Sequence, residues 1–571
     1  MPKSRKVTVA EVYLRLLKSR GVDYIFANAG TDFAPIIEAY AAVKDQSKLP
    51  EPITVPHENV AISMAHGYYL ATGKVAAVMV HVTVGTANAI CGLYNASRDR
   101  VPILFTAGRT PLTEFELHGS RNAGIHWAQE MFDQAGMLRE LVKWDYELRN
   151  GAQVASVVDR ALELARSEPS GPVYLSLPRE VLGMDVELPE IGDGSLRRPA
   201  VPAAADANAI DEAADILSRA ENPLIVSRNA GRSAESAAAL DALASAFAIP
   251  VLEYRPCTNG LAGDHPMNLG FDAKPHVSEA DVIVTLDTDA PFTKQMQSPP
   301  AEDCRIIQIG ADPLFENYPI RGFPRELAIT STLESALPML NDALGGRRNG
   351  VKKRADARRK RIREIQKSRA ERMKGALRKA KAGAPIHPAW ISHCLDQATD
   401  GEAMIFNDYG LQLPFMPNTK PRTHFGTPLA GGLGWGTGAT IGARFGANGR
   451  LCVSATGDGS YMFSNPVPAT QVSAAYDKPI LSIVLNNARW FAVQRATMSM
   501  YPQGKAVQSN RMAMSTLEPS PKFEMVADMM DGHGERVDDP AELAGALDRA
   551  IKAVTVDRRP AVLNVICGAD Y

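Results

Sequence analysis

Cysteine is scarce in this sequence, and no two cysteines have the spacing of a zinc site. The six stand far apart along the chain: Cys91, Cys257, Cys304, Cys394, Cys452 and Cys567. A small secreted protein held by disulfides would carry more of them, at closer spacing. The pattern therefore predicts reduced, buried thiols in a cytoplasmic protein.

Long apolar runs are missing as well. No stretch of about 18 apolar residues occurs, so we expect no membrane-spanning helix and no membrane partner. Residues 1–20 have the pattern of an amphipathic helix and lack the apolar core of a signal peptide. The sequence also has no Gly-x-Gly-x-x-Gly, the fingerprint of dinucleotide-binding folds, and no evident short repeat.

Net charge is small, because 62 Lys and Arg nearly balance 64 Asp and Glu. The exception is residues 347–381, where 17 basic residues face three acidic ones. This run has a helical pattern and no interleaved aromatic residues, which favours a basic linker helix between domains. Attraction to nucleic acid, an anionic surface or a phosphorylated substrate remains the alternative. We do not expect nucleic acid to be the partner.

The length of 571 residues is too great for one core, and 45% hydrophobic residues are typical of a globular protein. Apolar strands alternate with helical patterns in three successive regions, which predicts an α/β protein of three doubly wound parallel sheets. The predicted boundaries are 1–185, 195–345, a linker helix at 346–384, and 385–571. Expected strands include 24–27, 53–55, 75–84, 103–106, 173–177, 223–226, 250–252, 281–286 and 305–309.

One stretch of the third region carries the strongest chemical signal. An apolar run at 451–455 ends in Thr456-Gly457-Asp458-Gly459-Ser460, and another at 480–485 ends in Asn486-Asn487. A helix that opens with Asn465 and Pro466 lies between them, so both polar ends fall at the same edge of a parallel sheet. The glycines let the backbone approach a bulky anion, and the oxygens of Asp458 and Asn487 suit Mg²⁺.

Gly-Asp-Gly followed by Asn-Asn resembles the thiamine diphosphate (ThDP) enzymes of the benzoylformate decarboxylase and acetolactate synthase group. Here Asn487 follows Asp458 by 29 positions. The resemblance spans the whole chain and implies pyrimidine-binding, middle and diphosphate-binding domains, with ThDP and Mg²⁺ as cofactors. It implies Mg²⁺ ligation by Asp458, Asn487 and the backbone of Arg489. The implied cofactor contacts in this region are Gly457, Asp458, Gly459, Ser460, Asn487, Gly410 and Leu411, although residues 407–411 also fit a plain strand-end turn.

In the first region, Glu58 directly follows a predicted strand and starts a helix. The resemblance implies that this carboxyl binds the aminopyrimidine ring of ThDP and exchanges a proton with it, which makes Glu58 both catalytic and cofactor-binding. The alternative is a carboxylate that only complements the helix dipole.

Two further segments align without gaps with benzoylformate decarboxylase. In His81-Val-Thr-Val-Gly85-Thr86-Ala-Asn88, the resemblance makes His81 an active-site acid or base. In Gly431-Gly432-Leu433-Gly434, it makes Gly431 and Leu433 cofactor-binding, with Leu433 between the two rings of ThDP. A core histidine and a helix-entry leucine are the alternatives.

The sequence also departs from that enzyme. Thr31 stands where the decarboxylase has an active-site serine, and Thr293-Lys294-Gln295 replaces its second catalytic histidine. Gln129, within Trp127-Ala128-Gln129-Glu130, resembles a glutamine of acetolactate synthase that faces the cofactor. His126 could be a second polar group or a surface residue, and Trp490 and Phe491 could be pocket wall or ordinary core. The middle region has no persuasive match to flavin contacts, so FAD is not assigned.

The resemblance implies an enzyme that breaks or forms a C–C bond next to a carbonyl. The expected reaction is decarboxylation of a small 2-oxo acid, carboligation to an acyloin, or both. The alternatives are a 2-hydroxyacyl-CoA lyase, with CoA phosphates on the basic segment, and a non-catalytic ThDP-fold binding protein. The family builds each active site across two chains, so we expect a homodimer or a dimer of dimers (a homotetramer).

Overall fold

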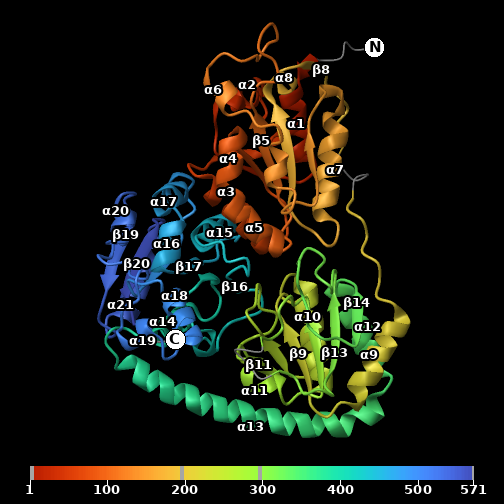
Figure 1. The fold of residues 1–571 in the computed structure, drawn as a ribbon, viewed down its shortest axis with the longest axis vertical. Helices are drawn as coiled ribbons and strands as arrows, with labels where there is room; N and C mark the ends of the chain where they lie inside the picture. Colours follow the sequence, from red (N-terminus) through yellow and green to blue (C-terminus); the bar gives the residue numbers. More distant parts are fainter. Residues whose placement is uncertain (1–5, 193–197, 294–298, 569–571) are drawn as a thin grey trace. The chain divides into compact units, whose positions relative to one another are not determined.

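The structure is a computed structural model that describes residues 6–192, 198–293 and 299–568. Three six-stranded sheets, each all-parallel, confirm the predicted α/β class (Figure 1). None of the helices in these ranges is both long and apolar enough to cross a membrane. Lys294 and Gln295, noted above as a departure, and the first five residues of the predicted N-terminal helix lie outside the described residues.

The first sheet has the strand order β3-β2-β4-β5-β7-β6. Its strands are β2 (Tyr24–Ala27), β3 (Glu51–Thr54), β4 (Ala77–Val80), β5 (Leu104–Arg109), β6 (Asp145–Glu147) and β7 (Val173–Pro178). The helices here are α1 (Val9–Ser19), α2 (Ala34–Ala42), α3 (Glu58–Thr72), α4 (Val82–Asn88), α5 (Ile90–Arg98), α6 (Ile125–Ala128), α7 (Val154–Arg166) and α8 (Arg179–Leu182). Strands β1 (Lys6–Thr8) and β8 (Asp185–Glu187) form a separate antiparallel pair. The helix predicted over residues 1–20 was therefore wrong at residues 6–8, and α1 begins only at Val9.

One strand prediction in this region was wrong at its end. The apolar run 75–84 was expected to be a single strand, but β4 stops at Val80 and α4 begins at Val82. The backbone turns at Val82, whose φ is +28°. A continuous apolar run looks the same for a buried strand and a buried helix, so the sequence could not locate this turn.

The middle sheet has the order β11-β10-β9-β12-β13-β14. Its strands are β9 (Pro223–Ser227), β10 (Val251–Glu253), β11 (Asn268–Gly270), β12 (Val282–Leu286), β13 (Arg305–Gly310) and β14 (Leu327–Thr330). Its helices are α9 (Ala207–Arg219), α10 (Ala234–Phe247), α11 (Lys274–Val277) and α12 (Leu333–Gly345).

The third sheet has the order β16-β15-β17-β18-β20-β19. Its strands are β15 (Met404–Asp408), β16 (His424–Gly426), β17 (Cys452–Gly457), β18 (Leu481–Asn486), β19 (His533–Val537) and β20 (Ala561–Ile566). The helices of this part of the chain are α14 (Pro388–Thr399), α15 (Trp435–Arg444), α16 (Asp458–Phe463), α17 (Pro466–Ala475), α18 (Phe491–Met500), α19 (Lys505–Gln508), α20 (Met525–Asp528) and α21 (Leu543–Thr555).

The predicted strand–helix–strand unit is present, because β17 and β18 are parallel neighbours. Two of its details differ from the prediction. A short helix, α16, begins at Asp458 directly after β17. Asn465 precedes α17 as predicted, but its φ is +51° and its side chain makes no N-cap hydrogen bond. The amide instead donates to the carbonyl of Phe463 at 3.2 Å.

Contacts group the chain into two compact units. One comprises residues 1–201, 428–449 and 463–479, and the other comprises 202–427, 450–462 and 480–571. Helices α15 and α17 therefore belong with the first sheet, although they lie among the strands of the third sheet in chain order. The predicted domain boundaries stay predictions.

Within the first unit, α15 packs so closely against α3 that there is room only for glycine at the points of contact. A Cβ atom added to Gly67 would lie 1.9 Å from the carbonyl oxygen of Ala439, and one added to Gly442 would lie 1.9 Å from that of Met64. Gly438 faces Ser63 in the same way, at 2.7 Å. Small residues every four positions let the two backbones touch, which fixes the start of α3, where Glu58 stands.

The predicted basic helix is confirmed as α13 (Arg348–Lys381). Its first half is anchored to the middle region by arginines. Arg358 donates to the carbonyls of Ala220 and Phe247, and Arg359 donates to that of Ser245 at 3.1 Å. These carbonyls belong to the C-terminal ends of α9 and α10, where unsatisfied oxygens and the helix dipole attract a cation.

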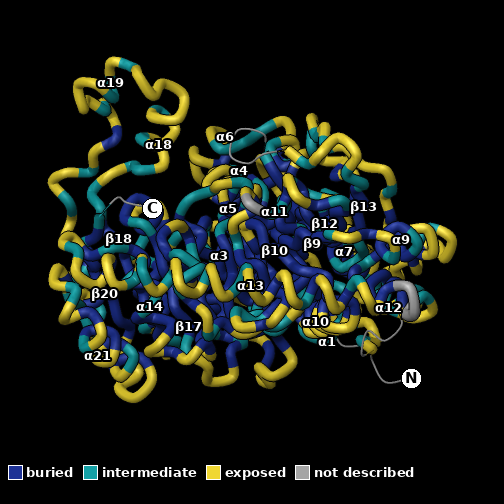
Figure 2. The backbone as a smooth tube through the Cα atoms, turned by 90° about the horizontal axis from the view of Figure 1, so that it is seen from below, coloured by how far each residue is buried: buried dark blue, intermediate teal, exposed yellow. Residues whose placement is uncertain are grey.

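Most residues of the central strands are buried. Figure 2 shows exposed residues in surface segments such as α18 and α19. Neither of these two helices has a buried residue. All six cysteines are free of disulfides, and four of them are buried. Cys304 is half-buried and Cys91 is exposed, so the prediction of buried thiols was wrong for these two.

Candidate active site

Glu58 occupies the first position of α3, and three residues separate it from Thr54, the last residue of β3. Its Oε2 accepts a hydrogen bond from Nδ2 of Asn88 at 2.5 Å. Gly85 lies close by, since a Cβ at that position would approach Glu58 Oε1 to 3.4 Å. The carboxyl is half-buried, so Asn88 orients one oxygen and leaves the other available to a ligand.

His81 lies between β4 and α4 and is held by a buried aspartate. Its Nδ1 lies 2.5 Å from Oδ1 of Asp32, which is 2% exposed. Gly30 and Gly108 make room for the pair: a Cβ on Gly30 would lie 2.1 Å from the imidazole, and one on Gly108 would lie 1.8 Å from Asp32 Oδ2. The hydrogen bond to Asp32 raises the pKa of His81, against the opposing effect of burial, and the charge of Glu58 acts in the same direction as Asp32.

Gln129 approaches the other side of the imidazole. Its Nε2 lies 3.3 Å from Nε2 of His81. With Asp32 accepting the proton of Nδ1, Nε2 faces the side-chain amide of Gln129. That amide can donate to the neutral ring through its nitrogen or, turned over, accept from the protonated ring through its oxygen. The structure thus brings together two residues that the sequence predicted separately, and it adds Asp32, which the sequence reasoning missed.

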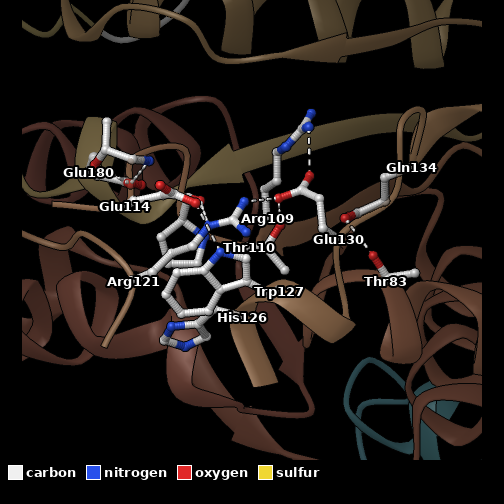
Figure 3. A network of polar contacts seen from close by, with 12 residues as sticks. Thr83, Arg109, Thr110, Glu114, Arg121, His126, Trp127, Glu130, Gln134 and Glu180 are labelled. Atoms are coloured by element: carbon white, nitrogen blue, oxygen red, sulfur yellow. Dashed lines mark hydrogen bonds and ion pairs between the residues drawn. The ribbon is translucent and has the colours of Figure 1, made fainter. Parts of the chain in front are cut away.

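The loop that carries Gln129 is fixed by a polar network (Figure 3). Glu130 accepts hydrogen bonds from Arg109 at 2.9 Å, from Thr110 at 2.5 Å and from Arg121. The Arg121 guanidinium in turn lies over the ring of Trp127, 5.2 Å from its centroid. The contacts of Glu130, which follows Gln129, and of Trp127, which precedes it, therefore fix the position of Gln129 on an otherwise exposed loop.

Two other predicted residues lie nearby. Thr31 is exposed and begins the short 3₁₀ turn that carries Asp32. His126 is 4% exposed, so the alternative that it is a surface residue was wrong. Burial and the cations of Arg179 and Arg121 lower the pKa of His126.

Gly432 and Asn95 hold the glycine-rich loop in place. Asn95 Nδ2 donates to the Gly432 carbonyl at 2.8 Å, and the Gly432 amide donates back to Asn95 Oδ1 at 3.0 Å. Gly431 and Gly434 have φ values of +72° and +84°, which a residue with a side chain rarely adopts. Leu433 is held half-buried between them. Asn95 had no motif in the sequence to reveal it.

The second unit carries the Asp458 group, at the carboxyl ends of β17 and β18. Asp458 is 3% exposed, and its Oδ1 accepts the amide of Gly459 at 2.8 Å. Its buried Oδ2 accepts no hydrogen bond of good geometry among the described residues. Burial raises the pKa of Asp458, and the nearby amides of residues 459 and 487–489 oppose that shift.

Asn487 follows β18 directly and is half-buried. Its side-chain oxygen accepts the amide of Arg489 at 3.0 Å and keeps a second lone pair. The Trp490 ring packs on Gly459, where a Cβ would lie 2.2 Å from it. Phe491 begins α18 and is half-buried. The third predicted ligand, the carbonyl of Arg489, stays a prediction.

Residues 407–411 complete this edge of the sheet. Ser460 donates to the buried Asp408 at 2.5 Å, which ties α16 to the end of β15. Tyr409 and Gly410 have φ values of +63° and +155°. Gly410 packs on Leu485, 2.9 Å from the place of a Cβ. Leu411 donates its amide to Asn407 at 3.2 Å, so this turn is closely packed against β17 and β18.

Sequence models of one family match all three regions of the chain. They are described as thiamine pyrophosphate enzyme, N-terminal TPP binding domain (residues 7–137), central domain (210–337) and C-terminal TPP binding domain (409–565). The chain belongs to the thiamine pyrophosphate enzymes. Thiamine pyrophosphate is the same compound as ThDP, so the family predicted from the sequence is confirmed.

The relatives are distant. The acetolactate synthase large subunit of Haemophilus influenzae is 25% identical over 97% of this chain and 94% of its own length. Benzoylformate decarboxylase of Pseudomonas aeruginosa is 25% identical over 85% of this chain and 88% of its own length. A solved 4-hydroxybenzoylformate decarboxylase of Rhodococcus jostii has a TM-score of 0.76 at 21% identity, covers 99% of this chain and 100% of its own, and shows the shared fold.

The Asp458 group fits the family's cofactor and its metal. A buried carboxylate oxygen without a hydrogen bond is a ready ligand for a hard cation. Within the described residues, no group of three or more His, Cys, Asp or Glu side chains could hold a metal. A metal at Asp458 would therefore complete its shell with amide, backbone and ligand oxygens, as Mg²⁺ on a diphosphate does.

Proposed function

We propose that this chain is a ThDP- and Mg²⁺-dependent enzyme that decarboxylates a small 2-oxo acid. When bound, ThDP would supply the nucleophile and the electron sink that decarboxylation next to a carbonyl needs. Asp458 and Asn487 would hold Mg²⁺ and, through it, the diphosphate, with the backbone of Arg489 as a third ligand. Gly457, Gly459, Ser460, Gly410 and Leu411 form the cradle around it.

Glu58 acts on the aminopyrimidine ring of the cofactor. Its half-buried carboxyl has one oxygen occupied by Asn88, so the other can exchange a proton with the ring nitrogen. A protein that only binds ThDP has no need of this carboxyl, which argues against the non-catalytic alternative. Leu433, half-buried on the loop held by Asn95, would contact the rings of the cofactor.

The Asp32–His81–Gln129 group is the observation that carries the proposal. Decarboxylation yields an aldehyde only if a proton reaches the carbon that lost the carboxylate. The contact with Asp32 favours protonated His81, so the imidazole can deliver that proton through Nε2. Gln129 orients Nε2, and Thr31 and His126 are candidates to contact the substrate.

Carboligation is the second candidate, because Gln129 resembles a residue of acetolactate synthase. If a second carbonyl compound reaches the site before the proton does, the product is an acyloin. None of the site residues described above favours the aldehyde over the acyloin. We therefore expect the outcome to depend on which substrates are present.

The CoA lyase alternative has less support. It relied on the basic segment to hold CoA phosphates. Arg358 and Arg359 of α13 already donate to helix carbonyls, and Arg361 is paired with Glu279 at 2.7 Å. Three cations of the first half of α13 are therefore already engaged, while Lys352, Lys353 and Lys360 stay exposed.

The test is a substrate screen with the full chain loaded with ThDP and Mg²⁺. The panel comprises straight, branched and aromatic 2-oxo acids, alone and with an aldehyde acceptor, plus a 2-hydroxyacyl-CoA thioester. We expect carbon dioxide release from at least one 2-oxo acid, with the aldehyde or acyloin identified by mass. Cleavage of the thioester alone would overturn the proposal, and Glu58→Gln serves as the inactive control.

A further inference from the structure

A cavity of about 380 Å³ lies within the second compact unit, away from the residues discussed so far. It is bounded by the second half of α13, the loop around β11, and residues 413–417 after β15. Most of its wall is apolar, with Phe271, Met373, Leu377 and Phe415 among the lining side chains. Its size falls in the range of pockets that hold small organic molecules, about 300–1,000 Å³.

Arg369 is the charged group that distinguishes this cavity. Its guanidinium packs flat on Gly270, where a Cβ would lie 2.5 Å from Nη2 and 2.6 Å from Cζ. Gly270 has a φ of +86° and leaves the space that the guanidinium fills. The nearby helix arginines Arg358 and Arg361 are paired, but the hydrogen bonds and ion pairs of the described part of the chain include none for Arg369.

An arginine in this setting is costly without an anion. Arg369 is half-buried, and burial lowers its pKa, which means that the protein penalises its charge. Asp264 is the one acidic residue of the lining, and its side chain is exposed. Gln366 is already committed through Nε2 to the carbonyls of His265 and Asn268, at 3.2 and 3.3 Å.

We propose that this cavity binds a small organic acid, with its carboxylate on Arg369 and its apolar body among Phe271, Met373, Leu377 and Phe415. A guanidinium offers two parallel donors that match a carboxylate. Lys374 lies at the rim, exposed and 3.2 Å from Glu371, so it adds attraction without filling the cavity. The proposal is independent of the proposed reaction, because none of these residues belongs to the site described above.

Binding there would also reach the cofactor region of the same unit. Residues 413–417 follow Leu411 almost directly, and Gln412 donates its amide to Ser392 at 2.8 Å. A ligand that contacts residues 413–417 would also stabilise the adjoining turn at 407–411, which is proposed to bind the cofactor. Binding in the cavity could therefore change cofactor binding, as an effector does.

The probe is 3-phenylpropionate, with 3-phenylpropanamide as its uncharged counterpart. Calorimetric titration uses the full chain loaded with ThDP and Mg²⁺, as wild type, Arg369→Gln and Arg372→Gln. Arg372 is an exposed arginine of the same helix and serves as the matched control. We expect one acid per chain in wild type and Arg372→Gln, and affinity lower by about tenfold or more in Arg369→Gln and for the amide.

A second variant covers the case in which Arg369→Gln perturbs α13. Ala370 lines the cavity and is exposed, so Ala370→Trp fills the space while the charge remains. We expect it to lose the probe as well, with an unchanged thermal midpoint. Equal binding to wild type and both cavity variants would overturn the proposal, and so would no binding to wild type at millimolar probe.

Discussion

At the scale of single residues, the candidate site depends on carboxyl groups placed in two opposite ways. Asp32 is buried against the imidazole of His81 and raises its pKa, whereas Asp458 is buried beside amides with one oxygen unused. The first arrangement stabilises a charge within the protein. The second leaves a charge for something that the protein binds.

Asp32→Asn should lower the pKa of His81 while leaving cofactor binding intact. The contact with Asp32 holds the pKa of His81 above its ordinary value, so removing the carboxylate returns it toward that value or below. The alkaline limb of the activity profile, where His81 loses its proton, then moves to lower pH. We expect turnover at pH 7 to fall by about tenfold to a hundredfold.

The measurement is the pH dependence of kcat for wild type and Asp32→Asn, with ThDP affinity determined in parallel. Asp215→Asn is the control, because the Asp215 side chain is 43% exposed and forms an ion pair with Arg219 at 2.6 Å on the surface of α9. An unshifted profile in Asp32→Asn would show that His81 does not limit turnover.

Asp458→Asn should affect the empty and the loaded protein in opposite directions. Burial raises the pKa of Asp458, so its contribution favours folding below the ordinary aspartate pKa and declines as the pH rises to the folded value. At neutral pH the carboxylate therefore costs stability in the absence of metal, and Asn removes that cost. Mg²⁺ binding should weaken by about tenfold or more, since even outer-shell partners of a metal contribute that much.

Thermal midpoints with and without ThDP and Mg²⁺ check both halves of this expectation. The midpoint of the cofactor-free variant should equal or exceed that of wild type, and its rise on adding cofactors should be smaller. Glu58→Gln is the comparison that should keep the full rise. A wild-type rise in Asp458→Asn would remove Asp458 from the metal site.

At the scale of elements, much of the fold could be predicted because the central strands are continuous apolar runs. Strands β2, β4, β5, β9, β12, β17 and β18 all lie within or overlap such runs, although the run at 75–84 extends past the end of β4. The missed strands include β6, β11, β14, β16 and β19, which all lie at an edge of a sheet. The interior strand β20 and the separate pair β1 and β8 were missed as well. An edge strand pairs on one side only and needs fewer apolar residues, so its pattern is weak.

The site residues also fall into two groups, those that local sequence motifs identify and those that only the folded structure identifies. Asp458, Asn487, Glu58 and His81 stand in local motifs at strand ends, and the sequence identified them as candidates. Asp32 and Asn95 act across 49 and 337 positions of the chain, on His81 and Gly432. No spacing rule covers contacts of that length, so only the folded structure reveals them.

The packing of α3 on α15 gives a prediction at this scale. Gly442→Ala puts a Cβ where the carbonyl oxygen of Met64 lies, so one helix must move. We expect a loss of about 1–3 kcal/mol in the free energy of unfolding, with reduced activity because Glu58 starts α3. The readout is the thermal midpoint together with activity.

Gly375→Ala in α13 is the matched control, because a Cβ there would meet no atom within 4 Å. Replacing a helical glycine in open space should stabilise the chain by about 0.5–1 kcal/mol. Equal effects at positions 442 and 375 would mean that α3 and α15 tolerate separation.

At the scale of the whole molecule, the question is how the Glu58 group and the Asp458 group, both proposed to bind ThDP, would contact the same cofactor. They belong to different compact units of the chain. The family resemblance predicts that each active site takes one group from each of two chains. A two-fold dimer would then contain two equivalent sites.

Mixing two inactive variants tests this directly. Glu58→Gln and Asp458→Ala are each expected to abolish activity in a pure homodimer, since every site lacks one group. In a mixed dimer with sites built across the two chains, one site carries both changes and the other carries neither. Unfolding and refolding the variants together in equal amounts makes about half of the dimers mixed, so activity should return to about one quarter of the wild-type value.

Light scattering should report at least a dimer for each variant and for the refolded mixture. If both groups of a site come from the same chain, every site in the mixture still lacks one of them, and the activity stays at the level of the separate variants.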